Sequence, residues 1–169
     1  DMTVEESLTF FDHKDAICQK IKGKINALKE VGLEYVQLGQ SSSTLSGGEA
    51  QRIKLASFLT HNRTKNRKLF IFDEPTTGLH FHDVKKLIKA LQDLIEMGHH
   101  IVIIEHHLDI IKIADWIIDL GLEGGEKGGD LTFQGNPEDF LKSNVTSYTK
   151  THLENCLLYT SPSPRDRFL

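Results

Sequence analysis

The sequence has little cysteine, no long apolar run and no excess of positive charge, and each shortage excludes a class of protein. Its 2 cysteines, Cys18 and Cys156, form no C-x-x-C pair, which argues against a disulfide framework and predicts free thiols in a reducing cytoplasm. No apolar run approaches the roughly 20 residues that cross a bilayer, and the first residues do not resemble a signal peptide. The net charge of −4 gives no reason to expect nucleic-acid binding by this chain alone.

The composition that remains is that of a globular domain with a helical N-terminal part. The 169 residues are 38% hydrophobic and 26% charged, enough for one domain with a core. Thr3 and Glu6 are spaced as a capping box for a helix through Phe11. Residues 40–44 are polar and predict a loop. Between the first helix and this loop, an apolar stripe predicts a second helix that ends at Gly32. The stripe consists of Ile17, Ile21, Ile25, Leu28 and Val31.

Apolar runs and amphipathic stretches alternate in the centre of the chain. Short apolar runs predict strands at residues 69–72, 101–104 and 116–120, the first two buried on both faces. Amphipathic stretches predict helices at residues 84–95 and 108–114. This order predicts an α/β fold with a parallel sheet and right-handed crossovers. A Gly-rich turn at 121–129 leads to a predicted edge strand at 131–133, and Asn136 with Pro137 predicts a further helix start.

The segment LSGGEAQR, residues 45–52, is the first that can carry chemistry. Its two glycines let the backbone approach a ligand, and the helix that follows would point free N–H groups and the positive end of its dipole at an anion. The Ser46 hydroxyl can donate to a phosphate oxygen. An ordinary helix start explains the segment about as well, with Ser46 as N-cap and Glu49 completing a capping box.

A second segment delivers two adjacent carboxylates to the end of a strand. Asp73 and Glu74 follow the predicted strand 69–72, at the edge where ligands bind in open α/β sheets. Asp73 is suited to Mg²⁺, which prefers oxygen ligands, and Glu74 to deprotonating a water that attacks a γ-phosphate. The alternative is an acidic turn after a core strand.

Histidines and a basic loop complete the candidate groups. His106 follows the strand at 101–104 and can reach the same phosphate, whereas a lone histidine in such a turn is more often a surface residue. A single metal site is disfavoured, because its ligands would lie at opposite ends of a strand that rises about 3.3 Å per residue; they would be His99, His100, Glu105, His106 and His107. The basic loop at 61–68 could contact DNA phosphates, but a solvated connector explains it better.

Taken in order, these segments resemble the distal half of an ABC ATPase: signature motif, Walker B, D-loop and switch histidine. Within that superfamily LSGGEAQR, DEPTTGLH, VIIEHHLDIIK and ADWIIDLGLEGGEKGG are similar to the UvrA family, in its second ATPase domain. The resemblance runs from about Asp1 to about Thr149. It implies a partial ABC-type (P-loop NTPase) nucleotide-binding domain, with a parallel sheet core, flanking helices and a helical signature subdomain.

The resemblance also implies roles for matching residues. The signature residues would contact the ATP of a partner ATPase domain; they are Leu45, Ser46, Gly47, Gly48 and Glu49. Asp73 would serve Mg²⁺, Glu74 the attacking water, and His106 would be the switch histidine. A D-loop would let two ATP sites sense each other; it comprises Thr76, Thr77, Gly78, Leu79 and His80. The family usually has Asn at position 107 and Pro at position 122, where this chain has His107 and Leu122.

Two family features are missing from the sequence. It contains no G-x-x-x-x-G-K-[ST] segment and no zinc-binding cysteine pairs, which are expected upstream of Asp1. Mg²⁺ and a base need a cradle for the phosphates, so this chain alone is expected to bind ATP weakly and not to hydrolyse it. The family implies a cytoplasmic, homodimeric, ATP-dependent protein of nucleotide excision repair that binds damaged double-stranded DNA and loads the helicase-like component of the excinuclease, UvrB.

Two alternative assignments fit the motifs less well. A nucleotide-binding subunit of an ABC transporter usually has Gln in place of Glu49 and a Ser-Ala-Leu-Asp type of D-loop. A chromosome-maintenance ATPase needs heptad coiled coils, which are absent. A third interpretation treats the chain as a non-enzymatic interaction module, which a nucleotide-binding titration would separate from an active ATPase. The expected organisation is a helical lead-in at 1–44, the distal half of an ABC ATPase domain at 45–154, and a non-native tail at 155–169 that continues no pattern and resembles translated adapter sequence.

Overall fold

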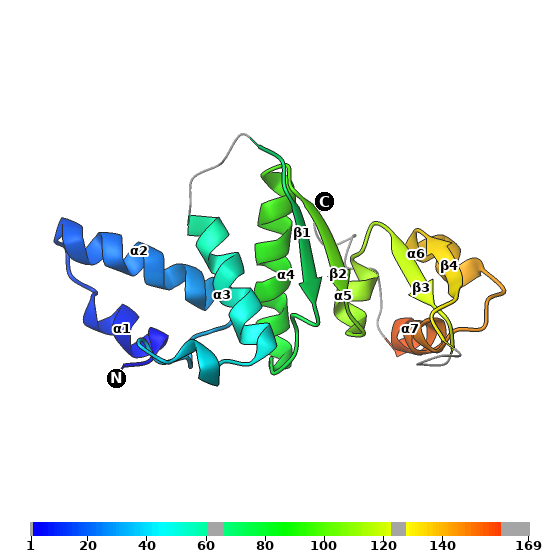
Figure 1. Cartoon of the computed structure of the whole chain (residues 1–169), viewed down its shortest axis with the longest axis horizontal. Coiled ribbons are helices and arrows are strands. Elements are labelled where there is room, and N and C mark those ends of the chain that lie inside the picture. Colours follow the sequence, from blue (N-terminus) through cyan, green and yellow to red (C-terminus); the bar gives the residue numbers. More distant parts are fainter. Residues whose placement is uncertain (1, 61–65, 123–127, 160–169) are drawn as a thin grey trace. The chain divides into compact units, whose positions relative to one another are not determined.

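The computed structural model describes residues 2–60, 66–122 and 128–159, with side chains through residue 156. The chain divides into two compact units, Asp1–Glu105 and His106–Leu169, each with its own pair of strands (Figure 1). The boundary between these units, after Glu105, differs from the boundaries that the motifs suggested, after residues 44 and 154. The division suggested by the motifs stays a prediction. In the described part of the chain, every helix is too short or too polar to cross a bilayer.

The first unit begins with helices and continues as an alternation of helix and strand. Its elements are α1 (Val4–Phe10), α2 (Ala16–Glu30), the 3-10 turn η1 (Ser42–Thr44), α3 (Gly47–Thr60), β1 (Leu69–Asp73), α4 (Phe81–Glu96) and β2 (His100–Ile104). The predicted capping box is confirmed: Thr3 Oγ1 accepts from the Glu6 N–H, and the Glu6 carboxylate accepts from the Thr3 N–H. α2 ends before Gly32, whose φ of 75° is the left-handed conformation that glycine adopts without strain.

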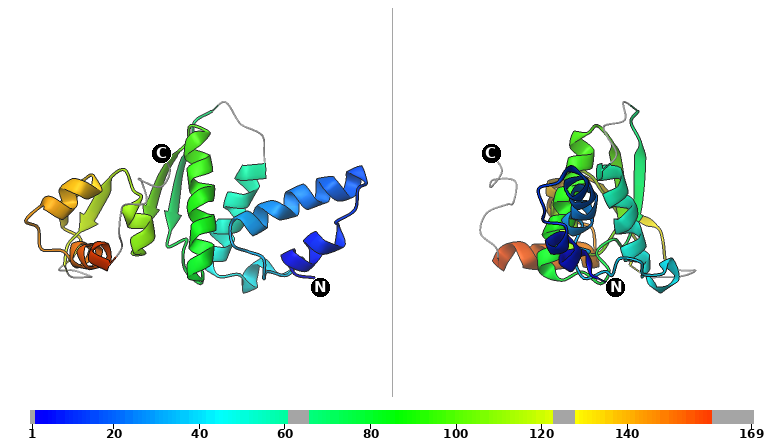
Figure 2. Two further views of the ribbon diagram at one scale, coloured as in Figure 1. Left: turned by 180° about the vertical axis from the view of Figure 1, so that it is seen from behind. Right: turned by 90° about the vertical axis from the view of Figure 1, so that its left-hand side faces the viewer.

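The apolar stripe of α2 is buried over only part of its length. Ile25 is in the core, but Ile17 at the start of the helix is 72% exposed. The predicted helix is present, but the first turn of its apolar stripe lies at the surface. α2 packs mainly against α1 and α3, and less against α4 (Figure 2).

β1 and β2 form a parallel pair connected by α4. The register runs from Leu69 opposite His100 to Asp73 opposite Ile104, so the carboxyl ends of both strands lie at the same edge. α4 buries one face in the core, through Val84, Leu87, Ala90, Leu91 and Leu94. The predicted strand–helix–strand unit is confirmed, and with it the α/β fold class.

The prediction that both strands are buried on both faces was wrong. Side chains alternate along a strand, and one face packs on the helices: Phe72 is buried, and the Phe70 ring meets the Phe58 ring of α3 edge-on at 4.8 Å. The other face is open, with Ile71 65% and Ile104 56% exposed. Because no described element of the first unit covers this face, apolar side chains that the sequence pattern assigns to a core remain at its surface.

The second unit contains α5 (Leu108–Lys112), β3 (Ile117–Leu120), β4 (Leu131–Gly135), α6 (Pro137–Lys142) and α7 (Tyr148–Tyr159). Its core is formed by Ile111, Ile117, Phe140 and Leu153. The predicted start of α6 is confirmed: Asn136 Oδ1 accepts from the Asp139 N–H at 2.8 Å, and Pro137 takes the first helical position.

The prediction that residues 116–120 add a third parallel strand was wrong. β3 pairs antiparallel with β4, with Ile117 opposite Gly135. Strand order in sequence suggested a common sheet, but β4 follows β3 closely enough to pair with it first. The Gly-rich turn between them falls largely on residues 123–127, outside the described residues.

α7 continues through the start of the expected tail. The helix extends to Tyr159, so the backbone of residues 155–159 is helical rather than patternless. Cys156 belongs to this helix, and its thiol accepts a hydrogen bond from Lys112 Nζ at 2.8 Å. Both cysteines are free, as predicted. Residues 160–169 lie outside the described part of the chain.

Candidate functional site

The diglycine segment forms the first turn of α3. Ser46 Oγ accepts from the Glu49 N–H at 3.2 Å, and Glu49 Oε2 accepts from the Ser46 N–H at 2.7 Å. This is the capping box that the ordinary helix start predicts. The Ser46 hydroxyl hydrogen is not used in it and can still be donated to another oxygen. A helix cap and a phosphate contact at Ser46 are therefore compatible.

Glu49 is held by a second contact, from the segment that leads to the signature. The Tyr35 hydroxyl donates to Glu49 Oε1 at 2.7 Å. This hydrogen bond, with those from Ser46, lowers the pKa of the Glu49 carboxyl below its usual value. The pKa of Tyr35 is raised, mainly by desolvation and to a smaller extent by the hydrogen bond to Glu49. Both carboxylate oxygens of Glu49 thus serve contacts within the chain.

The N–H groups of Gly47 and Gly48 have no hydrogen-bond partner in the described part of the chain. They are among the first N–H groups of α3, which a helix cannot satisfy internally. Together with the Ser46 hydroxyl they form a small set of donors at the positive end of a 14-residue helix. Donors at a helix N-terminus suit an anion such as a phosphate.

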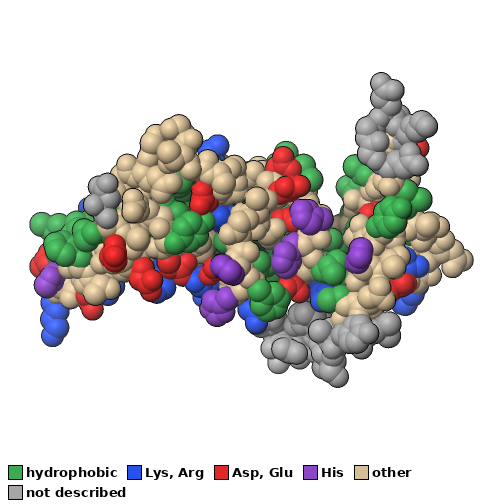
Figure 3. All heavy atoms as spheres, turned by 90° about the horizontal axis from the view of Figure 1, so that it is seen from below, with side chains coloured by type: hydrophobic (Ala, Val, Ile, Leu, Met, Phe, Trp, Pro, Cys, Tyr) green, Lys and Arg blue, Asp and Glu red, His purple; other side chains and the backbone are tan. Residues whose placement is uncertain are grey.

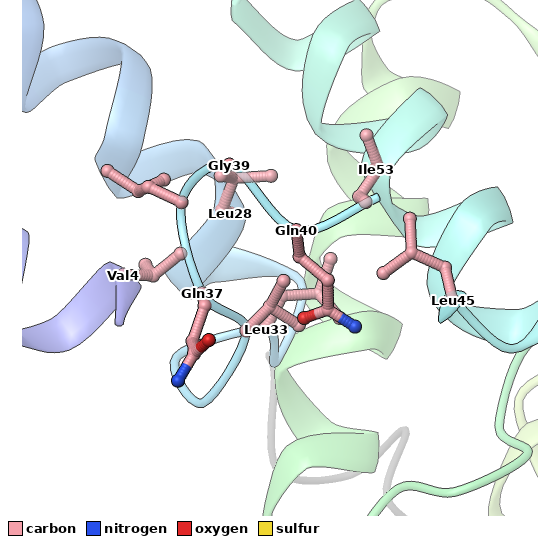
Figure 4. Close-up of a pocket in the computed structure, with 10 residues that line it drawn as sticks. Val4, Leu28, Leu33, Gln37, Gly39, Gln40, Leu45 and Ile53 are labelled. Carbon is pink, nitrogen blue, oxygen red and sulfur yellow. The ribbon is translucent and has the colours of Figure 1, made fainter. Parts of the chain in front are cut away.

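An apolar pocket lies beside this helix start (Figure 4). Leu45 and Ile53 line one side of it, and Val4 and Leu28 line the other. Leu45, the first residue of the motif, thus borders an apolar hollow that α1 and α2 also line.

Asp73 and Glu74 lie at the carboxyl edge of the parallel pair, as predicted. Asp73 is the last residue of β1, and the Glu74 N–H donates to Ile104 O at 2.9 Å at the end of β2. Both residues are exposed. Glu74 has a φ of 46° and is the one non-glycine residue with positive φ among those described. Such a conformation is uncommon for a non-glycine residue and indicates a locally constrained turn.

Gln51 connects the diglycine helix to this edge directly. Its Nε2 donates to Asp73 O at 2.8 Å, and its Oε1 accepts from the Asp73 N–H at 3.1 Å. One side-chain amide therefore satisfies both backbone polar groups of Asp73. The helix start that presents Gly47 and the strand end that presents Glu74 are held in one fixed arrangement within the first unit.

Arg52 makes a second connection, inside the core. Its side chain is fully buried, and Nη1 donates to Pro75 O at 2.7 Å and to Thr77 O at 3.1 Å. A Cβ at position 48 would lie 3.1 Å from both Arg52 Nη1 and Thr77 O, so these neighbours would have to shift by a few tenths of an ångström. Packing within the chain therefore favours glycine at this position.

Residues 75–80 form a tight turn that leads into α4. The Leu79 N–H donates to Thr76 O at 3.0 Å, and Gly78 has a φ of 77°. His80 is the N-cap of α4 but makes no side-chain capping bond. The Thr76 N–H donates to Glu105 Oε1 at 2.8 Å, and the Thr76 hydroxyl donates to the same oxygen. The predicted D-loop is thus anchored to the residue after β2.

The histidines differ in what they contact. His107 Nδ1 accepts from the Asp109 N–H at 3.3 Å and so caps α5. His99 lies at the amino end of β2, where its ring meets Phe70 and Nδ1 accepts from the Lys68 N–H. His107 thus uses Nδ1 as a helix cap, and the choice of His106 as the histidine that serves a ligand stays a prediction. His106 is the second residue after β2 and the first of the second unit.

The carboxylate pair fits a magnesium ion that shares its ligands with a nucleotide. In the part of the chain that the structure describes, no three His, Cys, Asp or Glu side chains gather as a metal cage. Mg²⁺ in phosphoryl-transfer sites keeps several waters and takes only one or two carboxylates, with the rest from phosphates. Asp73 and Glu74, both exposed at the sheet edge, match that type of donor set.

Sequence reasoning did not predict the roles of Gln51, Arg52, Tyr35 and Glu105. Arg52 carried the clearest signal, because it precedes the buried Leu55 and Ala56 by three and four residues. A charged residue on the apolar face of a helix needs a buried partner. Gln51 and Glu105 act through backbone groups of distant residues, which no local pattern in the sequence reveals.

The basic loop falls mainly outside the described residues. Positions 61–65 are not described, whereas Arg67 and Lys68 are exposed, and Lys68 Nζ lies 4.8 Å from the centre of the Phe58 ring. Acidic and basic side chains are interspersed on the face shown in Figure 3. The predicted solvated connector therefore stays a prediction for this loop.

The strand pair with its carboxylates, the diglycine helix and the turn between them define the class: the distal part of an ABC-type ATPase domain. A family model described as "ABC transporter" matches residues 1–77. The chain is 54% identical over 157 residues to UvrABC system protein A of Aquifex aeolicus and 51% identical to that of Mesorhizobium japonicum, in each case over 93% of the chain and 16% of the relative. The crystal structure of UvrA2 from Deinococcus radiodurans matches with a TM-score of 0.73 and 39% identity, over 91% of this chain and 18% of that one.

The predicted resemblance to UvrA is therefore confirmed over nearly the whole chain. The chain spans about 16% of the length of the curated relatives that it matches. The same relatives favour a UvrA-like assignment over a transporter subunit, which the family model alone does not distinguish.

Proposed function

We propose that this chain is the distal part of the second ATPase domain in a DNA-damage-recognition subunit of bacterial nucleotide excision repair. The whole protein would be a cytoplasmic ABC-type ATPase that binds damaged double-stranded DNA in an ATP-dependent manner and loads the excinuclease component UvrB. ATP and Mg²⁺ would bind to the whole protein, and zinc only to a region upstream of this chain.

One observation carries the proposal. The carboxylates of Asp73 and Glu74 stand at the edge of a parallel strand pair, and Gln51 ties that edge to the helix that begins at Gly47. In this proposal the carboxylate pair and the N–H donors belong to two linked elements of the first unit, β1 and α3. An ABC-type mechanism needs both, because one chain supplies the carboxylates for its own ATP and the diglycine for the ATP of a partner domain.

The proposed chemistry follows from the positions of these groups. Glu74 would accept a proton from the water that attacks the γ-phosphorus, as the bond to the bridging oxygen of ADP breaks. Asp73 would hold Mg²⁺, which neutralises phosphate charge when bound. His106, the second residue after β2, would donate a hydrogen bond to the γ-phosphate.

The signature residues would act on a second nucleotide. The Ser46 hydroxyl and the N–H groups of Gly47 and Gly48 would donate to its γ-phosphate across a domain interface. Glu49 would hold Ser46 in place rather than meet the phosphate, since both of its oxygens are already hydrogen-bonded. Residues 76–80 would lie between the two ATP sites. The whole protein would form a homodimer that grips DNA between its subunits.

The test is lesion binding by the full-length protein that contains this chain. Duplex DNA of one sequence, with and without a bulky adduct, is titrated at fixed salt with ATP and Mg²⁺, then with EDTA. The proposal expects at least tenfold tighter binding to the adduct, and transfer of UvrB to the adduct only with ATP. Equal affinity for both duplexes, with nucleotide-dependent binding to membrane vesicles, would instead indicate a transporter subunit.

A further inference from the structure

Two side chains hold the turn that follows Glu74: one accepts hydrogen bonds from it and the other donates hydrogen bonds to it. Its N–H and hydroxyl donors at Thr76 meet the Glu105 carboxylate. Its carbonyl acceptors at Pro75 and Thr77 meet the Arg52 guanidinium. Thr76 itself is buried, with 8% of its surface exposed. The turn is therefore clamped by two side chains that lie far away in sequence.

Glu74 is the residue that this clamp constrains. Its φ of 46° lies in the left-handed region, which a residue with a Cβ adopts only when its surroundings hold it there. On its N-terminal side the Glu74 N–H is bonded to Ile104 O. Two residues later, Thr76 is bonded to Glu105, which directly follows Ile104. Adjacent residues at the end of β2 thus hold both flanks of the unusual backbone.

We propose that Glu105 is a positioning residue for the hydrolytic step: through Thr76 it keeps Glu74 in the left-handed conformation that aims its carboxylate at the attacking water. The inference rests on the proposed ATPase function. If the bonds to Thr76 are lost, the turn relaxes to an ordinary conformation and the Glu74 carboxylate points elsewhere. Nucleotide binding depends on other groups and is not affected.

The proposal predicts which side chains can replace Glu105. One oxygen accepts both Thr76 bonds, and an amide oxygen at the same distance can accept both without a negative charge. A shorter carboxylate fails to reach, and a methyl group offers no acceptor. Gln is therefore expected to preserve function, whereas Asp and Ala are not.

The experiment measures steady-state ATP hydrolysis by the full-length protein with Glu105→Ala, Glu105→Gln and Thr76→Val. Glu105→Ala is expected to lower kcat at least tenfold with KM and the affinity for a fluorescent ATP analogue unchanged within twofold. Glu105→Gln is expected to keep kcat within threefold of wild type. Thr76→Val, which removes only the hydroxyl bond, is expected to give an intermediate kcat. Glu96→Ala, at an exposed glutamate of α4, is the matched control.

The outcomes separate this inference from the function on which it rests. A wild-type protein that does not hydrolyse ATP would overturn the proposed function. Hydrolysis that Glu74→Gln abolishes but Glu105→Ala leaves at the wild-type kcat would overturn the inference alone. So would a Glu105→Gln variant as inactive as Glu105→Ala, because charge rather than hydrogen bonding would then matter. If Glu105→Ala does not fold, Glu105→Gln and Thr76→Val decide the question by the same criteria.

Discussion

The side-chain amide of Gln51 makes two hydrogen bonds to the backbone of Asp73, of 2.8 and 3.1 Å. It is the link between the helix that begins at the diglycine and the strand that ends in the carboxylate pair. Both elements belong to the first unit, so their relative position is a property of this part of the chain. Changes at this link should affect both functions that the site combines.

Gln51→Ala removes both bonds and is expected to destabilise the first unit by about 1–3 kcal/mol, at 0.5–1.5 kcal/mol for each hydrogen bond. Urea unfolding of the 169-residue chain, monitored by circular dichroism, gives the free energy of unfolding. Gln92→Ala, at an exposed glutamine of α4, should change it by less than about 0.5 kcal/mol. Equal effects of the two substitutions would show that the Gln51 bridge adds no stability.

The two glycines of the signature are expected to differ in their tolerance of a methyl group. An added Cβ at Gly48 lies 3.1 Å from Thr77 O, whereas one at Gly47 meets nothing within 4 Å. Gly48→Ala should therefore cost about 1–3 kcal/mol of overpacking. Gly47→Ala should be neutral or slightly stabilising, since Ala is the better helix former. The same urea titration compares them, and a Gly48→Ala variant as stable as Gly47→Ala would contradict the close approach.

The sequence predicted elements whose signals are local. The capping boxes at Thr3 and Ser46, the glycine that ends α2 and the amphipathic α4 all follow from spacing within one turn or one helix. The pairing of β3 was missed, because a third apolar run after a strand–helix–strand unit reads equally as a parallel or an antiparallel strand. Burial of β1 was overestimated, because periodicity shows that a residue is apolar and not what covers it.

Tyr35→Phe is expected to reduce the loss of stability on acidification. The Tyr35 hydroxyl is the first cause that holds the pKa of Glu49 below its usual value. A carboxyl with a lowered folded-state pKa contributes stability above its unfolded pKa, at about 4.3, and this contribution is lost as the pH falls through the folded pKa. Urea unfolding between pH 7 and pH 3 should show a larger free energy of unfolding for wild type than for Tyr35→Phe at pH 7. The two values should converge at low pH. A constant difference at every pH would contradict this linkage.

Neighbouring residues of β1 should differ strongly in their contribution to stability. Phe72 is 5% exposed and Ile71 is 65% exposed, on opposite faces of the strand. Phe72→Ala should destabilise the 169-residue chain by about 3–5 kcal/mol. Ile71→Ala should cost less than about 1 kcal/mol, because its side chain gains little from burial. A large loss at Ile71 would mean that the open face is covered in solution, and sedimentation analysis would then detect self-association.

The candidate site was predicted in part. Asp73, Glu74 and the diglycine were expected at ligand-binding positions because their residue types and neighbours are local features. Their connection through Gln51 and Arg52 was not expected, since side-chain bonds to distant backbone groups have no sequence period. In the sequence, Glu105 was considered only as a member of a disfavoured metal site. In the structure it accepts hydrogen bonds from Thr76 in the predicted D-loop.

In the proposed chemistry Glu74 is the base that activates water, and that chemistry depends most on this residue. Single-turnover hydrolysis of ATP should therefore be compared for wild type and Glu74→Gln in the full-length protein, with nucleotide binding measured on the same samples. We predict a rate lower by at least 100-fold, with unchanged affinity for ATP and Mg²⁺, because the amide keeps the shape of the side chain but cannot take a proton. Hydrolysis by Glu74→Gln at the wild-type rate would contradict this role.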